Sequence, residues 1–277
     1  MIELRLPTRE LRLLDRPEQI TYREHDLDER GFNRIVSAIS VPTLTVYPAA
    51  SAGRGAAAIV ICPGGGYEYL AIDRAGHALA RYFQQRGIVA AVLKCRLPAT
   101  PLAPDAIPLA HQDAASAIRV LRAHAATWGA SPERIGILGT SAGGHVAGFA
   151  AVFGGENKDR ADFAALLSPV VTLEEPLAHR GSRERLLGPK PAPAEIARLS
   201  LERQIRPGLP PFFVAHAQDD TVVPPQNSER LVDALRRHAV PVEPLYVPTG
   251  GHAFSSEPHG WGLMWRERFI RWLDALG

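Results

Sequence analysis

Five short, almost wholly apolar runs recur along the chain, and they limit its fold more than any other feature. They span residues 59–62, 88–93, 135–138, 163–167 and 212–215. Runs of this length are typical of strands that are buried on both faces of a sheet. Segments with the apolar spacing of helices separate or follow these runs, around Leu79, Ile118, Leu235 and Phe269. This alternation predicts an α/β fold with a mostly parallel central sheet and helices on both faces.

The 277 residues are expected to form a single domain, because α/β folds of this size commonly surround one core. Residues 1–40 are charged and irregular, which predicts an N-terminal extension. Residues 43–47 alternate polar and apolar side chains, as an edge or antiparallel strand does, and a turn through 49–55 is expected to follow. Residues 173–211 are rich in proline and arginine, which predicts loops or short helices rather than core.

The segment 173–211 is a candidate lid. In an open α/β sheet, ligands bind beyond the carboxyl ends of the strands, so an insertion that leaves such an end can cover the site. We therefore interpret 173–211 as a partial lid. A surface excursion without a function is the alternative interpretation.

Ser141 stands in the pattern Gly-Thr-Ser-Ala-Gly, between a predicted strand and a predicted helix. The apolar run 135–138 precedes it, and a segment of small residues that begins with Ala142 and Gly143 follows it. Glycines two positions to either side let the backbone turn sharply, which presents the serine hydroxyl beyond the strand end. The pattern alone is weak evidence, but in a strand–turn–helix context it predicts that Ser141 is a nucleophile.

A serine nucleophile needs a base to accept its proton and a carboxylate to orient that base. Asp219 and Asp220 both follow the last apolar run, on a loop at the carboxyl end of a strand. His252 follows the strand-like run 242–247 and two glycines, where its side chain can reach the serine. We predict that His252 is the general base and that one of the two aspartates orients it. The ordinary capping of a helix is the alternative role for either aspartate.

A glycine run, Gly64-Gly65-Gly66, follows the first apolar run and ends at Tyr67. Acyl transfer places negative charge on the former carbonyl oxygen, and a donor aimed at that oxygen contributes about 3 to 4 kcal/mol. We predict that the backbone N–H groups of Gly65, Gly66 and Ala142 form this oxyanion hole. A phosphate-binding loop is the rival interpretation, and it fails because neither a following Lys-Ser/Thr nor the Gly-x-Gly-x-x-Gly spacing is present.

Tyr67, Phe254 and Trp261 flank the predicted catalytic loops and are candidate side chains of a substrate pocket. Aromatic rings there can stack on a sugar or shape an acyl pocket, and packing in the core is the alternative role. Burial of the three side chains distinguishes the two. His145 is expected to pack the helix after Ser141. No pair of histidines has a metal-binding spacing, so neither a metal nor another cofactor is expected.

Together these motifs resemble those of bacterial acetylxylan-esterase-like α/β-hydrolases, relatives of the hormone-sensitive-lipase group. The similarity begins near Val41 and lies in residues 62–67, 92–97, 139–144, 219–220 and 250–252. It implies the α/β-hydrolase fold with its chain order of serine, acid and histidine. It also favours Asp220 over Asp219 as the orienting acid, because the sequence Asp-x-x-Val-Pro is similar to the acid loop of that fold. Pro63 stands where lipase-like relatives have the histidine of His-Gly-Gly-Gly, which makes the similarity to lipase-type enzymes weaker.

The resemblance implies a serine carboxylesterase that removes short acyl groups through an acyl-enzyme. Acetyl groups on carbohydrate, such as xylan or xylo-oligosaccharide, are the leading substrates. An amidase or exopeptidase with the same triad is the first alternative, although no acidic anchor pair for a substrate amine is evident. A binding protein that keeps the fold without catalysis is the second alternative, and the complete set of motifs argues against it.

Charge and hydropathy argue against several other classes of protein. The net charge of +2 is spread along the chain without a block of like charges, so nucleic acid is not an expected partner. No apolar run approaches the roughly 20 residues that cross a bilayer, and residues 1–15 lack the apolar centre of a secretory signal. We therefore expect a cytoplasmic protein whose partner is a small-molecule or oligosaccharide ester. A periplasmic or secreted protein whose signal peptide has been removed is the alternative.

Overall fold

The computed structural model of the protein describes residues 9–13, 21–26, 33–49, 55–154 and 159–277. Much of the predicted N-terminal extension therefore lies outside the described residues. The same holds for residues 50–54 of the turn that was expected after the strand 43–47.

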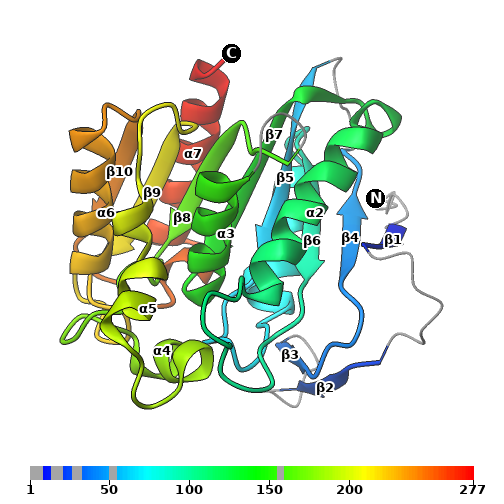
Figure 1. The fold of residues 1–277 in the computed structure, drawn as a ribbon. Helices are drawn as coiled ribbons and strands as arrows, with labels where there is room; N and C mark the ends of the chain where they lie inside the picture. Colours follow the sequence, from blue (N-terminus) through cyan, green and yellow to red (C-terminus); the bar gives the residue numbers. More distant parts are fainter. Residues whose placement is uncertain (1–8, 14–20, 27–32, 50–54, 155–158) are drawn as a thin grey trace.

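An eight-stranded sheet forms the centre of the molecule, with the strand order β1-β4-β6-β5-β7-β8-β9-β10 (Figure 1). Its strands are β1 (Arg9–Arg12), β4 (Thr43–Tyr47), β5 (Ala56–Cys62), β6 (Val89–Lys94), β7 (Ala130–Thr140), β8 (Phe163–Leu167), β9 (Phe212–Ala217) and β10 (Val242–Val247). The strands from β5 to β10 pair in parallel, whereas β4 pairs antiparallel with both β6 and β1. The predicted mostly parallel sheet is therefore confirmed.

Helices cover both faces of this sheet, as predicted. In Figure 1, α2 (Leu109–His124), α3 (Ala142–Phe153) and α6 (Gln226–Arg237) lie in front of the strands, and α7 (Gly260–Ala275) lies behind them. The short helix α1 (Ala78–Gln84) shares the face of α7. Phe83 of α1 packs edge-on against Phe269 of α7, with 5.6 Å between ring centroids. Both rings are fully buried, so they join the two helices to the sheet in one apolar core.

The interpretation of residues 1–40 as irregular is wrong where the structure describes them. The strand β1 forms an edge of the main sheet, and β2 (Arg23–Asp26) pairs with β3 (Arg34–Ser37) in a separate two-stranded sheet. These strands are four residues long, and every side chain of β2 is exposed. Because strand prediction relies on buried side chains recurring at every second position, such strands leave little signal in the sequence.

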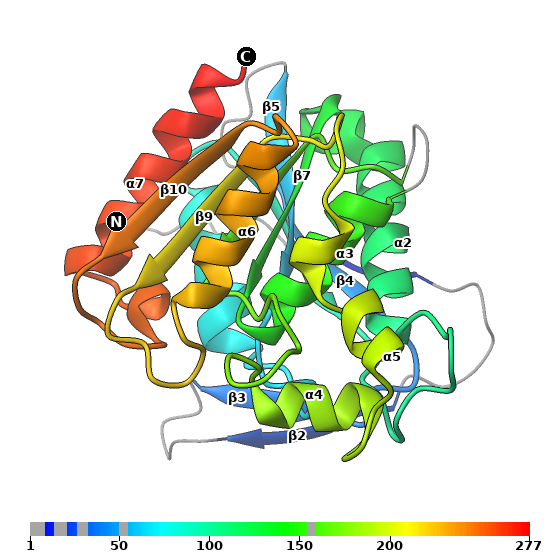
Figure 2. The same ribbon diagram turned by 60° about the vertical axis from the view of Figure 1, so that its left-hand side comes forward.

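The segment 173–211 contains the short helices α4 (Arg180–Leu187), α5 (Pro193–Arg198) and the 3-10 helix η3 (Leu201–Gln204). Figure 2 shows α4 beyond the carboxyl ends of the strands. The expectation of short helices is confirmed. The expectation that this segment lies outside the core is wrong for several of its leucines. These are fully buried in the main apolar cluster: Leu173, Leu186, Leu199 and Leu201. A regular apolar period is absent here because α4 buries only Ser182 and Leu186, η3 only Leu201, and α5 none of its side chains.

The remaining turns of helix are short. They are the π-helical turn η1 (Asp73–His77) and the 3-10 helices η2 (Ala125–Trp128) and η4 (Phe254–Ser256). Across the described ranges, no helix has both the length and the apolar character needed to cross a membrane.

Candidate active site

Ser141 lies at a sharp turn between β7 and α3. Its backbone has φ 58° and ψ −125°, a conformation that non-glycine residues rarely adopt. The chain is tightly packed on both sides of the turn. A Cβ atom on Gly139 would lie 2.0 Å from the carbonyl oxygen of Gly143, and one on Gly143 would lie 2.2 Å from that of Cys62. Glycine is therefore required at both positions if the serine is to stand at the end of β7.

Ser141, His252 and Asp220 form a chain of hydrogen bonds. The Oγ atom of Ser141 lies 2.9 Å from Nε2 of His252, and Nδ1 of His252 lies 2.7 Å from Oδ2 of Asp220. The three residues follow three different strands, β7, β9 and β10, whose carboxyl ends meet at one edge of the sheet. The structure thus brings the predicted nucleophile, acid and base together. An imidazole held in this way can accept the serine proton.

Asp220 is held as a carboxylate by a set of donors. Its Oδ1 atom accepts hydrogen bonds from the backbone N–H groups of Val222 and Val223, at 2.9 and 3.0 Å. Burial acts to raise the pKa of this carboxyl, but hydrogen bonds from His216, His252 and the backbone outweigh it and hold the pKa below its usual range. Asp220 is therefore ionised at neutral pH and can orient His252.

His216 is a functional neighbour that the sequence analysis did not identify. Its Nε2 atom lies 3.1 Å from Oδ2 of Asp220 and 3.0 Å from the carbonyl oxygen of Val223. Because both atoms are acceptors, Nε2 carries the proton, and Nδ1 accepts from the hydroxyl of Ser228 at 2.7 Å. The available signal was a histidine inside an otherwise apolar run, four residues before Asp220. A fully buried histidine needs partners, and here it positions the acid.

Asp219 has a different role from its neighbour. Its carboxylate accepts hydrogen bonds from the N–H groups of Gly250 and Gly251, at 3.2 and 2.8 Å. It therefore fixes the loop that carries His252, whereas Asp220 contacts the imidazole itself. This placement agrees with the preference for Asp220 that the family resemblance suggested.

The glycine turn after β5 lies directly against the serine. A Cβ atom on Gly64 would lie 3.0 Å from Cβ of Ser141. Gly65 has φ 146°, and a Cβ atom there would meet the carbonyl oxygen of Tyr69 at 2.0 Å, so no other residue fits. Within the described residues, the N–H groups of Gly65, Gly66 and Ala142 donate to no backbone carbonyl. These groups are the candidate donors for an oxyanion.

Tyr67 supports this turn through hydrogen bonds of its hydroxyl group. Its side chain is buried, with Oη 2.6 Å from Nδ1 of His145 and 3.1 Å from Nε2 of His111. Nε2 of His145 donates to the carbonyl oxygen of Leu199 at 2.8 Å. Nδ1 of His145 must then accept the Tyr67 proton, so Tyr67 in turn accepts from His111. The hydroxyl thereby ties the glycine turn to α2 and α3.

The prediction of a pocket role is wrong for Phe254. For Tyr67, which borders a small cavity beside the glycine turn, it stays a prediction. Tyr67 is 2% exposed and Phe254 is fully buried in the core, so neither ring can stack on a substrate. Closeness in sequence to the catalytic loops does not determine whether a side chain points into the core or towards a substrate. Trp261 is 40% exposed, and its Nε1 donates to Thr249. Its pocket role stays a prediction.

Stability should depend on pH through His145 and His111. Burial lowers the pKa of His145 to about 4 and that of His111 well below its usual value. Below about pH 6.5 the unfolded chain therefore binds protons that the folded protein does not bind. The free energy of unfolding should be level above that pH and fall towards pH 4, by up to about 1.4 kcal/mol per pH unit for each histidine.

Urea denaturation between pH 8 and pH 4.5 measures this dependence. The variant His145→Gln removes one titrating group and should show a shallower slope than the wild type. An unfolding free energy that stays level throughout this range would contradict the buried, neutral state of the two imidazoles.

Three comparisons with known proteins agree with this geometry. The family model BD-FAE matches residues 44–235. The chain is 31% identical to endo-1,4-beta-xylanase B of Butyrivibrio fibrisolvens, over 86% of this chain and 39% of that protein. It is 30% identical to an acetylxylan esterase of Xylanibacter ruminicola, over 71% of this chain and 41% of that protein. The chain thus spans about two fifths of the length of these curated relatives.

Among solved structures, an acetyl ester-xyloside bifunctional hydrolase from Caldicellulosiruptor lactoaceticus is similar over nearly the whole chain. The TM-score is 0.79 with 29% identity, covering 97% of this chain and 96% of that one. The resemblance to acetylxylan-esterase-like proteins that the motifs suggested is therefore confirmed. The match of the family model to most of the chain, together with this fold, shows that the chain belongs to the BD-FAE family and has the α/β-hydrolase fold.

Proposed function

We propose that this protein is a serine carboxylesterase that removes short acyl groups, above all acetyl, from carbohydrate such as xylan or xylo-oligosaccharide. The observation that carries the proposal is the hydrogen-bonded chain from Ser141 through His252 to Asp220. It stands beside the N–H groups of Gly65, Gly66 and Ala142, which donate to no backbone carbonyl of the described residues. This combination of nucleophile, base, acid and donors is the one that acyl transfer requires.

In the proposed mechanism, Oγ of Ser141 attacks the ester carbonyl while Nε2 of His252 accepts its proton. The N–H groups of Gly65, Gly66 and Ala142 stabilise the resulting oxyanion. The C–O bond to the alcohol then breaks, and His252 gives its proton to the leaving oxygen. Water, activated by the same imidazole, attacks the acyl-enzyme, which releases the carboxylic acid and restores the serine. Asp220 keeps Nδ1 of His252 protonated throughout and stabilises the imidazolium.

The preference for small acyl groups rests on the space beside the donors. A cavity of about 10 Å³ lies between the glycine turn and the start of α3 and is lined by Gly65, Ala142 and apolar neighbours including Cys62 and Val146. Such a volume holds about one water-sized group. The cavity adjoins the proposed oxyanion donors Gly65 and Ala142, and we propose that it takes the acetyl methyl group, whereas a longer acyl chain needs the walls to move. The proposal of a sugar as the alcohol rests on the xylan-related names of the relatives.

Hydrolysis of matched esters tests this function. We expect turnover of p-nitrophenyl acetate and of acetylated xylo-oligosaccharides, with kcat/KM falling from acetyl through butyryl to longer chains. The matched acetanilide should be hydrolysed far more slowly. Faster cleavage of the anilide would favour an amidase, and an increase of kcat/KM with chain length would contradict a small acyl pocket.

A further inference from the structure

His179 lies in the segment between β8 and α4, and its imidazole caps the first turn of α4. The Nδ1 atom accepts a hydrogen bond from the backbone N–H of Ser182 at 3.2 Å and lies 2.8 Å from the Ser182 hydroxyl. Because Nδ1 is an acceptor, the proton of the neutral ring is on Nε2. Burial, and then the nearby His252, lower the pKa of His179, which keeps the ring neutral at pH 7. Nε2 is therefore a hydrogen-bond donor.

The ring of His179 stands over the proposed oxyanion turn. Its Cε1 atom lies 3.5 Å from the position that a Cβ atom on Gly66 would occupy. The ring also lies close enough to His252 and Asp220 for their charges to affect its pKa. The side chain is half-buried, and within the described part of the chain Nε2 has no hydrogen-bond partner. A donor whose ring is fixed by Ser182 thus lies beside the glycine turn and near the His252–Asp220 pair.

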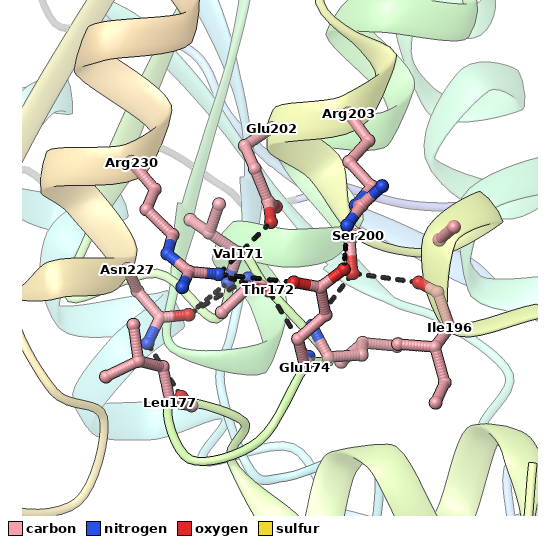
Figure 3. A network of polar contacts seen from close by, with 12 residues as sticks. Val171, Thr172, Glu174, Leu177, Ile196, Ser200, Glu202, Arg203, Asn227 and Arg230 are labelled. Atoms are coloured by element: carbon pink, nitrogen blue, oxygen red, sulfur yellow. Dashed lines mark hydrogen bonds and ion pairs between the residues drawn. The ribbon is translucent and has the colours of Figure 1, made fainter. Parts of the chain in front are cut away.

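One buried side chain ties the segment before His179 to the acid loop. Asn227 of α6 is fully buried, and its Oδ1 atom accepts from the N–H groups of Val171 and Thr172, at 2.9 and 3.0 Å. Its Nδ2 atom donates to the carbonyl oxygens of Leu177 and Pro224, at 2.9 and 3.2 Å. Leu177 precedes His179 by two residues, and Pro224 belongs to the loop that carries Asp220. Figure 3 shows Asn227 pointing at this stretch of backbone.

A second set of contacts holds the same stretch from its other side. Arg230 and Arg203 both bind the carboxylate of Glu174, and Ser200 accepts from the N–H of Leu173 at 3.0 Å (Figure 3). Ser200 in turn donates to the carbonyl oxygen of Ile196 at 2.8 Å. The segment before His179 is therefore fixed from α6 and from the helices after it. A donor on a rigid support loses little conformational entropy when it binds, which suits it to recognition.

We propose that His179 recognises the alcohol part of the substrate, with Nε2–H donating to a sugar oxygen next to the acylated hydroxyl. This inference rests on the proposed function. The N–H groups of the glycine turn take the carbonyl oxygen, and His252 protonates the leaving oxygen. A neutral donor close to both groups is left for the remaining part of the ester, which is the alcohol. Sugars carry acceptor oxygens on the carbons next to the ester, whereas a phenol ester has none there.

Two substitutions and two substrates test the proposal. The variant His179→Phe keeps a ring but removes both nitrogens, and His179→Gln keeps a donor near the position of Nε2. Against an acetylated xylo-oligosaccharide, His179→Phe should raise KM and lower kcat/KM by about tenfold, the effect of one lost hydrogen bond to the substrate. Against p-nitrophenyl acetate its kcat/KM should change less than about threefold. His179→Gln should recover part of the loss on the sugar ester.

Controls separate this role from others. The variant His238→Phe changes an exposed histidine at the end of α6 and should leave both activities unchanged. Equal losses of kcat on both substrates would assign His179 to the oxyanion site or to folding and overturn the proposal, and thermal unfolding of each variant identifies the second case. A failure of the proposed function would appear already in the wild type, as no hydrolysis of the acetylated sugar. That outcome would overturn the role of His179 as well, whereas a failure confined to the variants would overturn His179 alone.

Discussion

Replacing Ser141 with alanine should lower kcat for short acyl esters by about 10⁴- to 10⁶-fold, which is the range expected when a serine hydrolase loses its nucleophile. The Oγ atom stands 2.9 Å from the base, and no other side chain of the hydrogen-bonded chain can take its place. The fold should survive, because the change removes one atom and one hydrogen bond and keeps the backbone turn that Gly139 and Gly143 allow. We expect the free energy of unfolding to change by no more than about 1 kcal/mol. Steady-state kinetics on p-nitrophenyl acetate and thermal unfolding measure the two effects.

Ser168 provides a matched control for this variant. It is a fully buried serine in the turn after β8, it also has a positive φ, and its hydroxyl has no hydrogen-bond partner among the described residues. The variant Ser168→Ala should therefore keep wild-type activity. Turnover by Ser141→Ala close to that of the wild type would exclude Ser141 as the nucleophile.

Replacing Asp220 with asparagine should lower kcat by about 10⁴-fold, because it reverses the tautomer of the base. The Oδ1 position must accept the N–H groups of Val222 and Val223, so the carbonyl oxygen of the new amide should stay there. The NH₂ group then faces Nδ1 of His252. Nδ1 can pair with it only as an acceptor, which moves the ring proton to Nε2 and leaves no base for the Ser141 hydroxyl.

Asp219→Asn is the matched comparison, one residue away. Its single side-chain oxygen can keep the shorter hydrogen bond from the N–H of Gly251, whereas the bond from Gly250 to the other oxygen is lost. The loop of His252 therefore loses one of two exposed hydrogen bonds, and kcat should fall by less than about tenfold. Parallel measurement of kcat and of the unfolding midpoint distinguishes loss of chemistry from loss of structure. A larger loss of kcat in Asp219→Asn than in Asp220→Asn would mean that Asp219, rather than Asp220, orients His252.

The catalytic residues and the glycine turn could be predicted from the sequence because they closely follow strands of the sheet. Buried parallel strands appear as apolar runs, and the carboxyl ends of such strands meet at one edge of the sheet. The sequence alone therefore predicts that the motifs following β5, β7, β9 and β10 are neighbours. The bounds of β8 also follow from apolar content alone, since the strand ends where Ser168 begins a turn.

The residues that support the site could not be predicted in this way. Asn227 acts through contacts with backbone about 50 residues away, and no local pattern records which side chains will meet. His216 and His179 bond to residues three or four positions away, but their places beside the catalytic residues depend on the fold. Tyr67 shows the same limit, because its nearness to the glycine turn suggested a pocket. Its ring is buried and its hydroxyl bonds to two histidines, on α2 and α3, which the sequence around it does not indicate. The strands before residue 38 were not predicted, because they bury too few side chains to produce an alternating apolar pattern in the sequence.

The most direct test of a nucleophilic Ser141 is covalent labelling with a serine-reactive phosphonate, followed by peptide mapping with mass spectrometry. We predict one adduct per chain, located on Ser141, with loss of esterase activity in proportion to labelling. The variant Ser141→Ala should remain unlabelled, and Asp220→Asn should be labelled far more slowly than the wild type. Labelling at another residue, or full esterase activity in a protein that the phosphonate does not modify, would contradict an acyl-enzyme on Ser141.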